Sequence, residues 1–281
     1  MTGSPFKTQV FQLQRPLSRL YGLVAMMDSQ ARLSETARGF VDSVIKAFAS
    51  ADRLSLSLAA AILLITYLTV LVFTPPNIPT ASREQYDRIG PLTGPVFLWT
   101  RRATLGFFGF YHAFICLNYP PSLSSICPRP ENLNPKLFTW STYSIVCIVL
   151  VLVAAPIRLV CFRQLGPNFT FRLATPGKLI TTGLYSWAQH PSYTTNIIVA
   201  VANFALIERH DGVAGCWLPE SLVSSEKLGT VLTVGSWTMV AIACYALFVR
   251  IRDEEAMLKR TFGEEWEAYH KKTKRFVPFV F

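Results

Sequence analysis

Long apolar runs, nearly free of charges, alternate with polar segments along this chain. Residues 54–73 read LSLSLAAAILLITYLTVLVF, and a helix over this run is about 30 Å long at 1.5 Å per residue. Because that length matches the hydrocarbon core of a bilayer, the run predicts a transmembrane helix. Four further runs share this character: residues 103–119, residues 138–160 with Arg158 near the end, the shorter residues 193–207, and residues 229–249.

These runs predict an all-α integral membrane protein, a bundle of about five to six transmembrane helices followed by a C-terminal cytosolic helix. Residues 74–95 and 118–137 each contain several prolines, which interrupt helices, so both predict loops. The chain then divides into an N-terminal segment of unknown role at residues 1–53, N-terminal transmembrane helices at residues 54–160, and a region with a different pattern at residues 161–281.

The basic residues that give the net charge of +10 flank the apolar runs and form no stripe on a soluble domain. This placement indicates membrane orientation and argues against a nucleic-acid partner. Cytosolic loops are predicted where these residues gather, at Arg83, Arg88, Arg101 and Arg102, at Arg158, Arg163, Arg172 and Lys178, and after Arg250. Seven basic residues within residues 1–53 conflict with the luminal N-terminus that five spans require, so the number of spans stays open.

The six cysteines include no C-x-x-C pair and no zinc-type spacing, so no metal site is predicted. Four of them lie in or at the ends of apolar runs and are expected to be buried, namely Cys116, Cys147, Cys161 and Cys244. Cys127 and Cys216 fall in loops that five spans place on one luminal side. A disulfide between these two is therefore a hypothesis.

Residues 161–193, just before an apolar run, read CFRQLGPNFTFRLATPGKLITTGLYSWAQHPSY, a stretch rich in polar residues, glycine and proline. Irregular backbone beside a membrane is tolerated where it lines a cavity. Pro191 predicts a helix start with His190 as its cap, and Tyr193 then lies on the same side as the imidazole. An interfacial aromatic belt is the alternative explanation of this tetrapeptide.

A second polar cluster, RIRDEEAML, follows the last apolar run. Arg250 and Glu254 are four residues apart and share a helix face, which suits a zwitterionic ligand, although a solvated helix with ion pairs has the same pattern. The two apolar runs between Tyr193 and Arg250 would take the chain across the membrane and back. Both polar clusters are therefore expected on the same side of the membrane, at the mouth of one site. Apolar residues continue at helical spacing and would dock the tail on the bilayer or the bundle: Leu258, Phe262, Trp266 and Tyr269.

Three segments of residues 161–281, namely KLITTGLYSWAQHPSY, RIRDEEAML and FGEEWEAYHKKTKRFVPF, together resemble the isoprenylcysteine carboxyl methyltransferases. These membrane enzymes use S-adenosylmethionine to methylate the terminal carboxylate of prenylated CaaX-type proteins. The resemblance implies S-adenosylmethionine as the cofactor, with prenylated proteins or prenylcysteine and membrane lipid as partners. It also implies a multi-pass protein of the endoplasmic reticulum membrane with a cytosolic C-terminus. No glycine-rich nucleotide loop follows a strand, which excludes a Rossmann domain.

The resemblance also assigns roles to single residues. It makes Arg250 the catalytic and substrate-binding arginine and places Gln189 beside the substrate. The family usually has arginine at the position of Gln189. The neutral amide of glutamine cannot make the pair of charged hydrogen bonds that a guanidinium makes to a carboxylate. The implied cofactor-binding residues are Lys178, Leu179, Ile180, Tyr185, His190, Pro191, Ser192, Tyr193, Glu254 and Glu255.

The chemistry needs no general base, because a terminal carboxylate with a pKa near 3.5 is already ionised at pH 7. Catalysis would come from holding two reactants in line and excluding water. Gln189 keeps two alternatives open: a related membrane methyltransferase acting on a phospholipid amine or a small lipophilic acid, and an inactive membrane scaffold. An amine acceptor would need deprotonation, and His190 or Tyr185 would then act as acid or base.

Overall fold

The computed structural model describes residues 51–77, 87–119, 126–223 and 225–276, together with Glu35, Arg38, Gly39 and Asp42. The chain forms two compact units, Met1–Ala51 and Asp52–Phe281. Of the five described residues of the first unit, Ala51 lies outside any helix and Glu35, Arg38, Gly39 and Asp42 are helical. The N-terminal segment is otherwise described only at residues 51–53, and its remaining residues and the predicted cytosolic Arg83 lie outside the described residues. The division at residue 160 stays a prediction.

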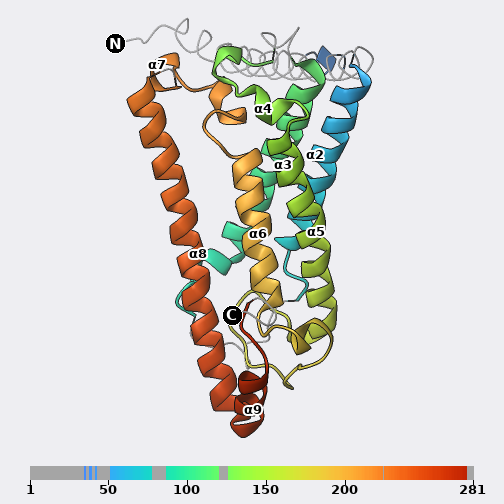
Figure 1. Ribbon diagram of the computed structural model, residues 1–281, viewed down its shortest axis with the longest axis vertical. Helices are drawn as coiled ribbons and strands as arrows, with labels where there is room; N and C mark the ends of the chain where they lie inside the picture. Colours follow the sequence, from blue (N-terminus) through green and yellow to red (C-terminus); the bar gives the residue numbers. More distant parts are fainter. Residues whose placement is uncertain are drawn as a thin grey trace, which may run out of the picture. The chain divides into compact units, whose positions relative to one another are not determined.

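The second unit is mostly helical, and its described residues contain no strand (Figure 1). The five apolar runs lie in α2 (Arg53–Val72), α3 (Pro95–Asn118), α5 (Thr142–Leu165), α6 (Pro191–Leu206) and α8 (Glu226–Phe262). Three stretches within the described residues are long and apolar enough to cross a membrane: Arg53–Val72, Thr142–Asn168 and Lys227–Phe262. The helical, membrane-type fold agrees with the sequence, whereas the count of five or six spans stays a prediction.

Close packing of α2 on α3 depends on a small residue at their contact. A Cβ added at Gly109 of α3 would lie 2.1 Å from Oγ1 of Thr66 on α2. The α2 helix also packs on α5, and α5 packs on α6. Asn203 of α6 donates a hydrogen bond of 2.8 Å to Thr69 of α2. Small residues and interhelical polar bonds are how helices associate in lipid, where apolar burial gives no advantage.

The α8 helix differs from the other long helices, because many of its apolar side chains before Arg250 are exposed, as expected for a surface in contact with lipid. It runs beside α6 with few contacts to it (Figure 1). Gly263, with φ +51°, ends α8 and turns the chain into α9 (Glu264–Lys272). The apolar residues at helical spacing are thus divided between two helices, Leu258 and Phe262 on α8 and Trp266 and Tyr269 on α9, because glycine breaks the helix between them. The exposed apolar residues of α8 are Leu228, Val231, Val234, Trp237, Met239, Ile242, Tyr245 and Phe248.

Short helical turns make most of the connections between the long helices. They are η2 (Gly90–Thr93), η4 (Pro130–Asn132), α4 (Pro135–Phe138), η5 (Gly166–Asn168), η6 (Gly183–Ser186), η7 (Val213–Cys216) and α7 (Glu220–Val223). In Figure 1, α4 and α7 lie at one end of this unit and α9 lies at the other.

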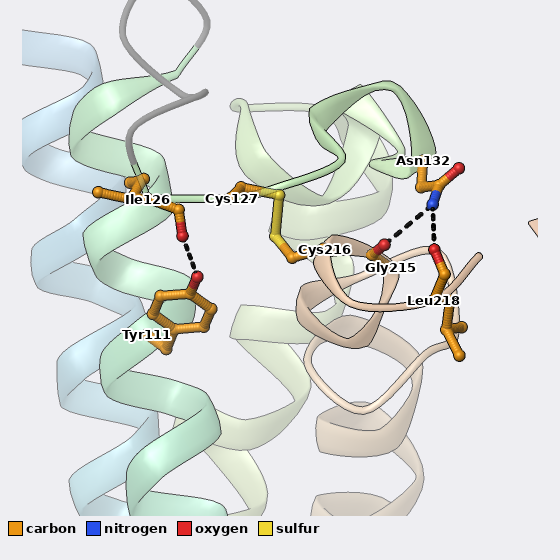
Figure 2. The surroundings of a disulfide bond; sticks show 7 residues. All are labelled: Tyr111, Ile126, Cys127, Asn132, Gly215, Cys216 and Leu218. Atoms are coloured by element: carbon orange, nitrogen blue, oxygen red, sulfur yellow. Dashed lines mark hydrogen bonds between the residues drawn. A yellow bond between two sulfur atoms is a disulfide. The ribbon is translucent and has the colours of Figure 1, made fainter. Parts of the chain in front are cut away.

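At the α4 end, Cys127 and Cys216 form a disulfide, which confirms the hypothesis from the sequence (Figure 2). The Tyr111 hydroxyl donates to the carbonyl of Ile126 beside it. Asn132 donates hydrogen bonds of 3.0 Å to the carbonyls of Gly215 and Leu218. Three of the four other cysteines, Cys116, Cys147 and Cys161, are buried as expected, whereas Cys244 is half-buried on the open α8 helix.

Replacing Cys127 with serine is expected to lower the free energy of unfolding by about 2–4 kcal/mol, because the disulfide closes a loop of 89 residues in the unfolded chain. The measurement is the denaturation midpoint of the detergent-solubilised protein, with Cys244→Ser as the control that removes a free thiol. A mass map under non-reducing conditions that finds Cys127 and Cys216 as free thiols would contradict this prediction.

Candidate active site

A cavity of about 300 Å³ lies among α3, α5, α6, α8, α9 and the irregular stretch before α6. Its size is at the lower end of the range for small-molecule sites. The residues that the resemblance assigned to cofactor or substrate line this cavity, apart from Pro191 and Glu255. Those in the lining are Lys178, Leu179, Ile180, Tyr185, Gln189, His190, Ser192, Tyr193, Arg250 and Glu254.

Two hydrogen bonds join the polar cluster at the start of α6 to the one near the end of α8. His190 Nε2 lies 3.2 Å from Oε1 of Glu255, and the Tyr193 hydroxyl donates a bond of 2.6 Å to Oε2 of Glu254. The expectation that the chain returns the second cluster to the side of the first is confirmed. Tyr193 and Glu254, which are 61 positions apart in the sequence, thus line the cavity side by side.

His190 occupies the cap position of α6 with Pro191 as the first helical residue, as the sequence predicts. The imidazole makes no cap hydrogen bond. Its ring turns instead toward Glu255 and lies 5.7 Å from the ring of Tyr193. The backbone carbonyl of His190 accepts the first bonds of the helix, from the amides of Tyr193 and Thr194.

Glu255 lies outside the cavity lining, and both oxygens of its carboxylate accept hydrogen bonds. Arg275 donates from Nε at 2.9 Å and from Nη2 at 3.0 Å, a bidentate arrangement. The amide of His190 donates 2.9 Å to the carbonyl of Arg275, which holds the C-terminal segment against the start of α6. Glu255 therefore orients His190. The sequence reasoning missed Arg275, whose only signal was the basic run KKTKR.

Gln189 lines the cavity, but its side-chain amide is bound to the C-terminal segment. It donates to the carbonyl of Thr273 and, at 3.3 Å, to that of His270. Its Oε1 lies 2.9 Å from Nδ1 of His270. The polar atoms of this amide are satisfied within the protein, and the amide binds the tail in the position where the family usually carries arginine.

Arg250 is buried and already has a carboxylate partner that the sequence did not suggest. Its Nη1 forms an ion pair with Asp87, and its Nη2 donates a bond of 3.1 Å to the carbonyl of Phe171. Asp87 also accepts from the amide of Leu173 at 3.2 Å. Asp87 lies in a proline-rich loop, 163 positions before Arg250, so no local pattern connects the two. An acceptor carboxylate would share the guanidinium with Asp87.

The charged residues of the cavity wall are mostly basic, with Glu254 as the one acidic residue among the described lining. Such an imbalance favours anionic ligands. The apolar part includes Ala200 of α6 and Ala243 and Ala246 of α8. The basic lining residues are Arg101, Arg158, Arg172, Lys178 and Arg250.

Several buried polar atoms around the cavity have no hydrogen-bond partner among the described residues. They are Oη of Tyr185, Oδ1 of Asn196 and Nε1 of Trp266. An unpaired buried polar group costs about 1–3 kcal/mol. Three of them around one cavity, from η6, α6 and α9, therefore indicate a place for a polar ligand. Burial also raises the pKa of Tyr185, which keeps its phenol protonated and able to donate at pH 7.

This donor and acceptor set fits S-adenosylmethionine, which combines ribose hydroxyls, an amino group, a carboxylate and an adenine ring. Tyr185 and Trp266 offer donors, whereas Asn196 and Glu254 offer acceptors. Tyr269 of α9 also lines the cavity, and its hydroxyl donates 2.6 Å to the carbonyl of Tyr185, so α9 closes this side. Among the described residues, no group of three or more His, Cys, Asp or Glu side chains has the arrangement of a metal site.

Comparison with known proteins finds similarity to isoprenylcysteine carboxyl methyltransferases. The model of the isoprenylcysteine carboxyl methyltransferase family matches residues 146–223. Protein-S-isoprenylcysteine O-methyltransferase of Xenopus laevis is 27% identical over 149 residues, which cover 52% of this chain and 43% of that protein. The probable protein-S-isoprenylcysteine O-methyltransferase of Oryza sativa subsp. indica is 28% identical over 152 residues, 53% of this chain and 68% of that protein.

The resemblance drawn from the sequence is confirmed by these matches. The family match includes the segment from Lys178 to Tyr193 and ends before Arg250 and Glu254. The chain spans less than half of the length of the Xenopus relative.

Proposed function

We propose that this protein transfers the methyl group of S-adenosylmethionine to the C-terminal carboxylate of prenylcysteine in CaaX-type proteins, at the cytosolic face of the endoplasmic reticulum membrane. One observation carries the proposal: the two polar clusters of the family resemblance meet around one cavity, through the contacts His190–Glu255 and Tyr193–Glu254. The apolar helices that surround this cavity support a lipid-modified acceptor.

In this proposal the residues of the chain bind and position the reactants, and S-adenosylmethionine supplies a methyl group activated by its positive sulfur. Glu254 accepts hydrogen bonds from the amino group or ribose hydroxyls, and Tyr185 and Asn196 complete the polar contacts. Arg250 holds the acceptor carboxylate in line with the methyl group. Such orientation contributes roughly 7–11 kcal/mol to lowering the barrier of a reaction between two bound reactants.

Water exclusion is the second contribution. Trp266 and Tyr269 of α9 cover the cavity, and the C-terminal segment holds the loop of Gln189 and His190 in place. A surrounding from which water is excluded strengthens the attraction between Arg250 and a carboxylate. The acceptor carboxylate needs no base, and the protonated phenol of Tyr185 serves as a donor.

The test is incubation of the purified protein with methyl-labelled S-adenosylmethionine and N-acetyl-S-farnesyl-L-cysteine. The expected product is a methyl ester that releases its label in base. Label in an alkali-stable lipid would instead support methylation of a phospholipid amine. Absence of any labelled product, together with absence of cofactor binding by calorimetry, would contradict the proposal and leave the scaffold interpretation.

A further inference from the structure

His270 of α9 links the loop before α6 to the wall of the cavity. It lies between two residues of the cavity lining, Gln189 and Trp266. Nδ1 of its imidazole is 2.9 Å from Oε1 of Gln189. Its ring is stacked on the indole of Trp266, with 4.5 Å between the ring centroids and 18° between the ring planes. A hydrogen bond and an aromatic stack therefore join Gln189 to Trp266 through one side chain.

The hydrogen bonds of Gln189 decide which nitrogen of this imidazole carries a proton. The amide nitrogen of Gln189 already donates to two backbone carbonyls, those of Thr273 and His270. Its Oε1 can only accept, so Nδ1 of His270 is the donor of the bond between them. Glutamine satisfies all three contacts because its amide both donates and accepts. The bond to Gln189 thereby stops the imidazole from turning about its side-chain bonds.

Trp266 is the residue of this trio that still lacks a polar partner. It is 6% exposed and lies four positions before His270, so the two rings share one side of α9. Its Nε1 is buried and has no hydrogen-bond partner in the part of the chain that the structure describes. An indole N–H only donates, so the missing partner is an acceptor. S-adenosylmethionine carries such acceptors in its carboxylate, its ribose hydroxyls and its adenine nitrogens.

We propose that Gln189 and His270 are positioning residues, which hold the indole of Trp266 where its N–H donates to S-adenosylmethionine. The inference rests on the proposed function and gives Gln189 a different role in it, because Gln189 then acts on the cofactor through His270 and Trp266. The stack on His270 fixes the plane of the indole, and the bond to Gln189 fixes the imidazole. A side chain that is ordered before the ligand arrives loses less entropy on binding.

The test is a double-mutant cycle on the dissociation constant of S-adenosylmethionine, measured by calorimetry with the purified full-length protein. Trp266→Phe removes the indole N–H and is expected to weaken binding about three- to tenfold. His270→Ala removes both the stack and the bond to Gln189, and a loss of about threefold or more is expected because the indole is no longer held. In the double variant the loss is expected to match that of Trp266→Phe alone within about twofold, since His270 acts only through Trp266.

Steady-state kinetics separates this role of Gln189 from acceptor binding. Gln189→Met removes the acceptor for His270 and the amide donors from a side chain of similar length. It is expected to raise the KM for S-adenosylmethionine about threefold or more, while the KM for N-acetyl-S-farnesyl-L-cysteine changes less than about twofold.

Two further variants complete the set. His270→Phe keeps a ring against Trp266 and is expected to lose less affinity than His270→Ala; it replaces His270→Ala in the cycle should that variant fail to fold. His210→Ala changes a histidine outside the cavity lining and is expected to leave the affinity for S-adenosylmethionine unchanged.

Losses that multiply in the double variant would overturn the inference, because His270 would then affect the cofactor without Trp266. Unchanged affinity in Trp266→Phe or in His270→Ala would overturn it too. A rise in the KM for the farnesylcysteine alone in Gln189→Met would place Gln189 at the acceptor and do the same. Each of these results, with normal binding by the wild type, overturns this inference alone. Wild-type protein that binds no S-adenosylmethionine would overturn the proposed function and this inference with it.

Discussion

Replacing Arg250 with alanine is expected to lower kcat/KM for N-acetyl-S-farnesyl-L-cysteine about 100-fold or more, with the affinity for S-adenosylmethionine changed less than threefold. A guanidinium that holds a carboxylate in a site shielded from water makes charged hydrogen bonds worth about 1.5–3 kcal/mol each, and alanine removes them all. The measurement is steady-state kinetics of methyl ester formation beside calorimetry with the cofactor.

A matched set of variants separates this role from stability, because Arg250→Ala also leaves Asp87 buried without its partner. Breaking such a pair destabilises a protein by about 3–5 kcal/mol. In the double variant Asp87→Asn/Arg250→Ala, the remaining amide is neutral, so the denaturation midpoint should recover while turnover stays low. If turnover recovers together with stability, Arg250 acts only by neutralising Asp87 and does not hold the acceptor.

Glu254→Gln is expected to weaken S-adenosylmethionine binding about 10- to 100-fold. Glu254 is the one acidic residue in the described cavity lining, and its carboxylate is oriented by the 2.6 Å bond from the Tyr193 hydroxyl. Glutamine keeps the shape but loses the charge that strengthens hydrogen bonds to an amino group or to ribose hydroxyls. Calorimetry measures the dissociation constant directly.

Two controls accompany this variant. Tyr193→Phe removes the orienting hydroxyl and leaves the carboxylate, so a smaller loss of about threefold is expected. Glu264→Gln changes an exposed glutamate at the start of α9 and should have no effect on affinity. Unchanged affinity in Glu254→Gln would remove Glu254 from the cofactor site.

The sequence by itself determined the helices and the return of the chain to one site. Apolar runs such as residues 54–73 become helices because a helix satisfies its own backbone hydrogen bonds, which lipid cannot do. Pro191 determined the start of α6, since proline suits the first helical position. Two apolar runs between Tyr193 and Arg250 were enough to bring the second cluster back beside the first.

Only the tertiary structure decided which side chain each charged residue meets. Arg250 pairs with Asp87 and Glu255 with Arg275, while Arg158 has no carboxylate partner among the described residues. Such partners come from loops and tails whose positions depend on packing, and no local spacing encodes a contact across 163 positions. The sequence brought the two polar clusters to one site and named ten of the residues that line the cavity, whereas packing alone decided how the buried charges around the cavity pair.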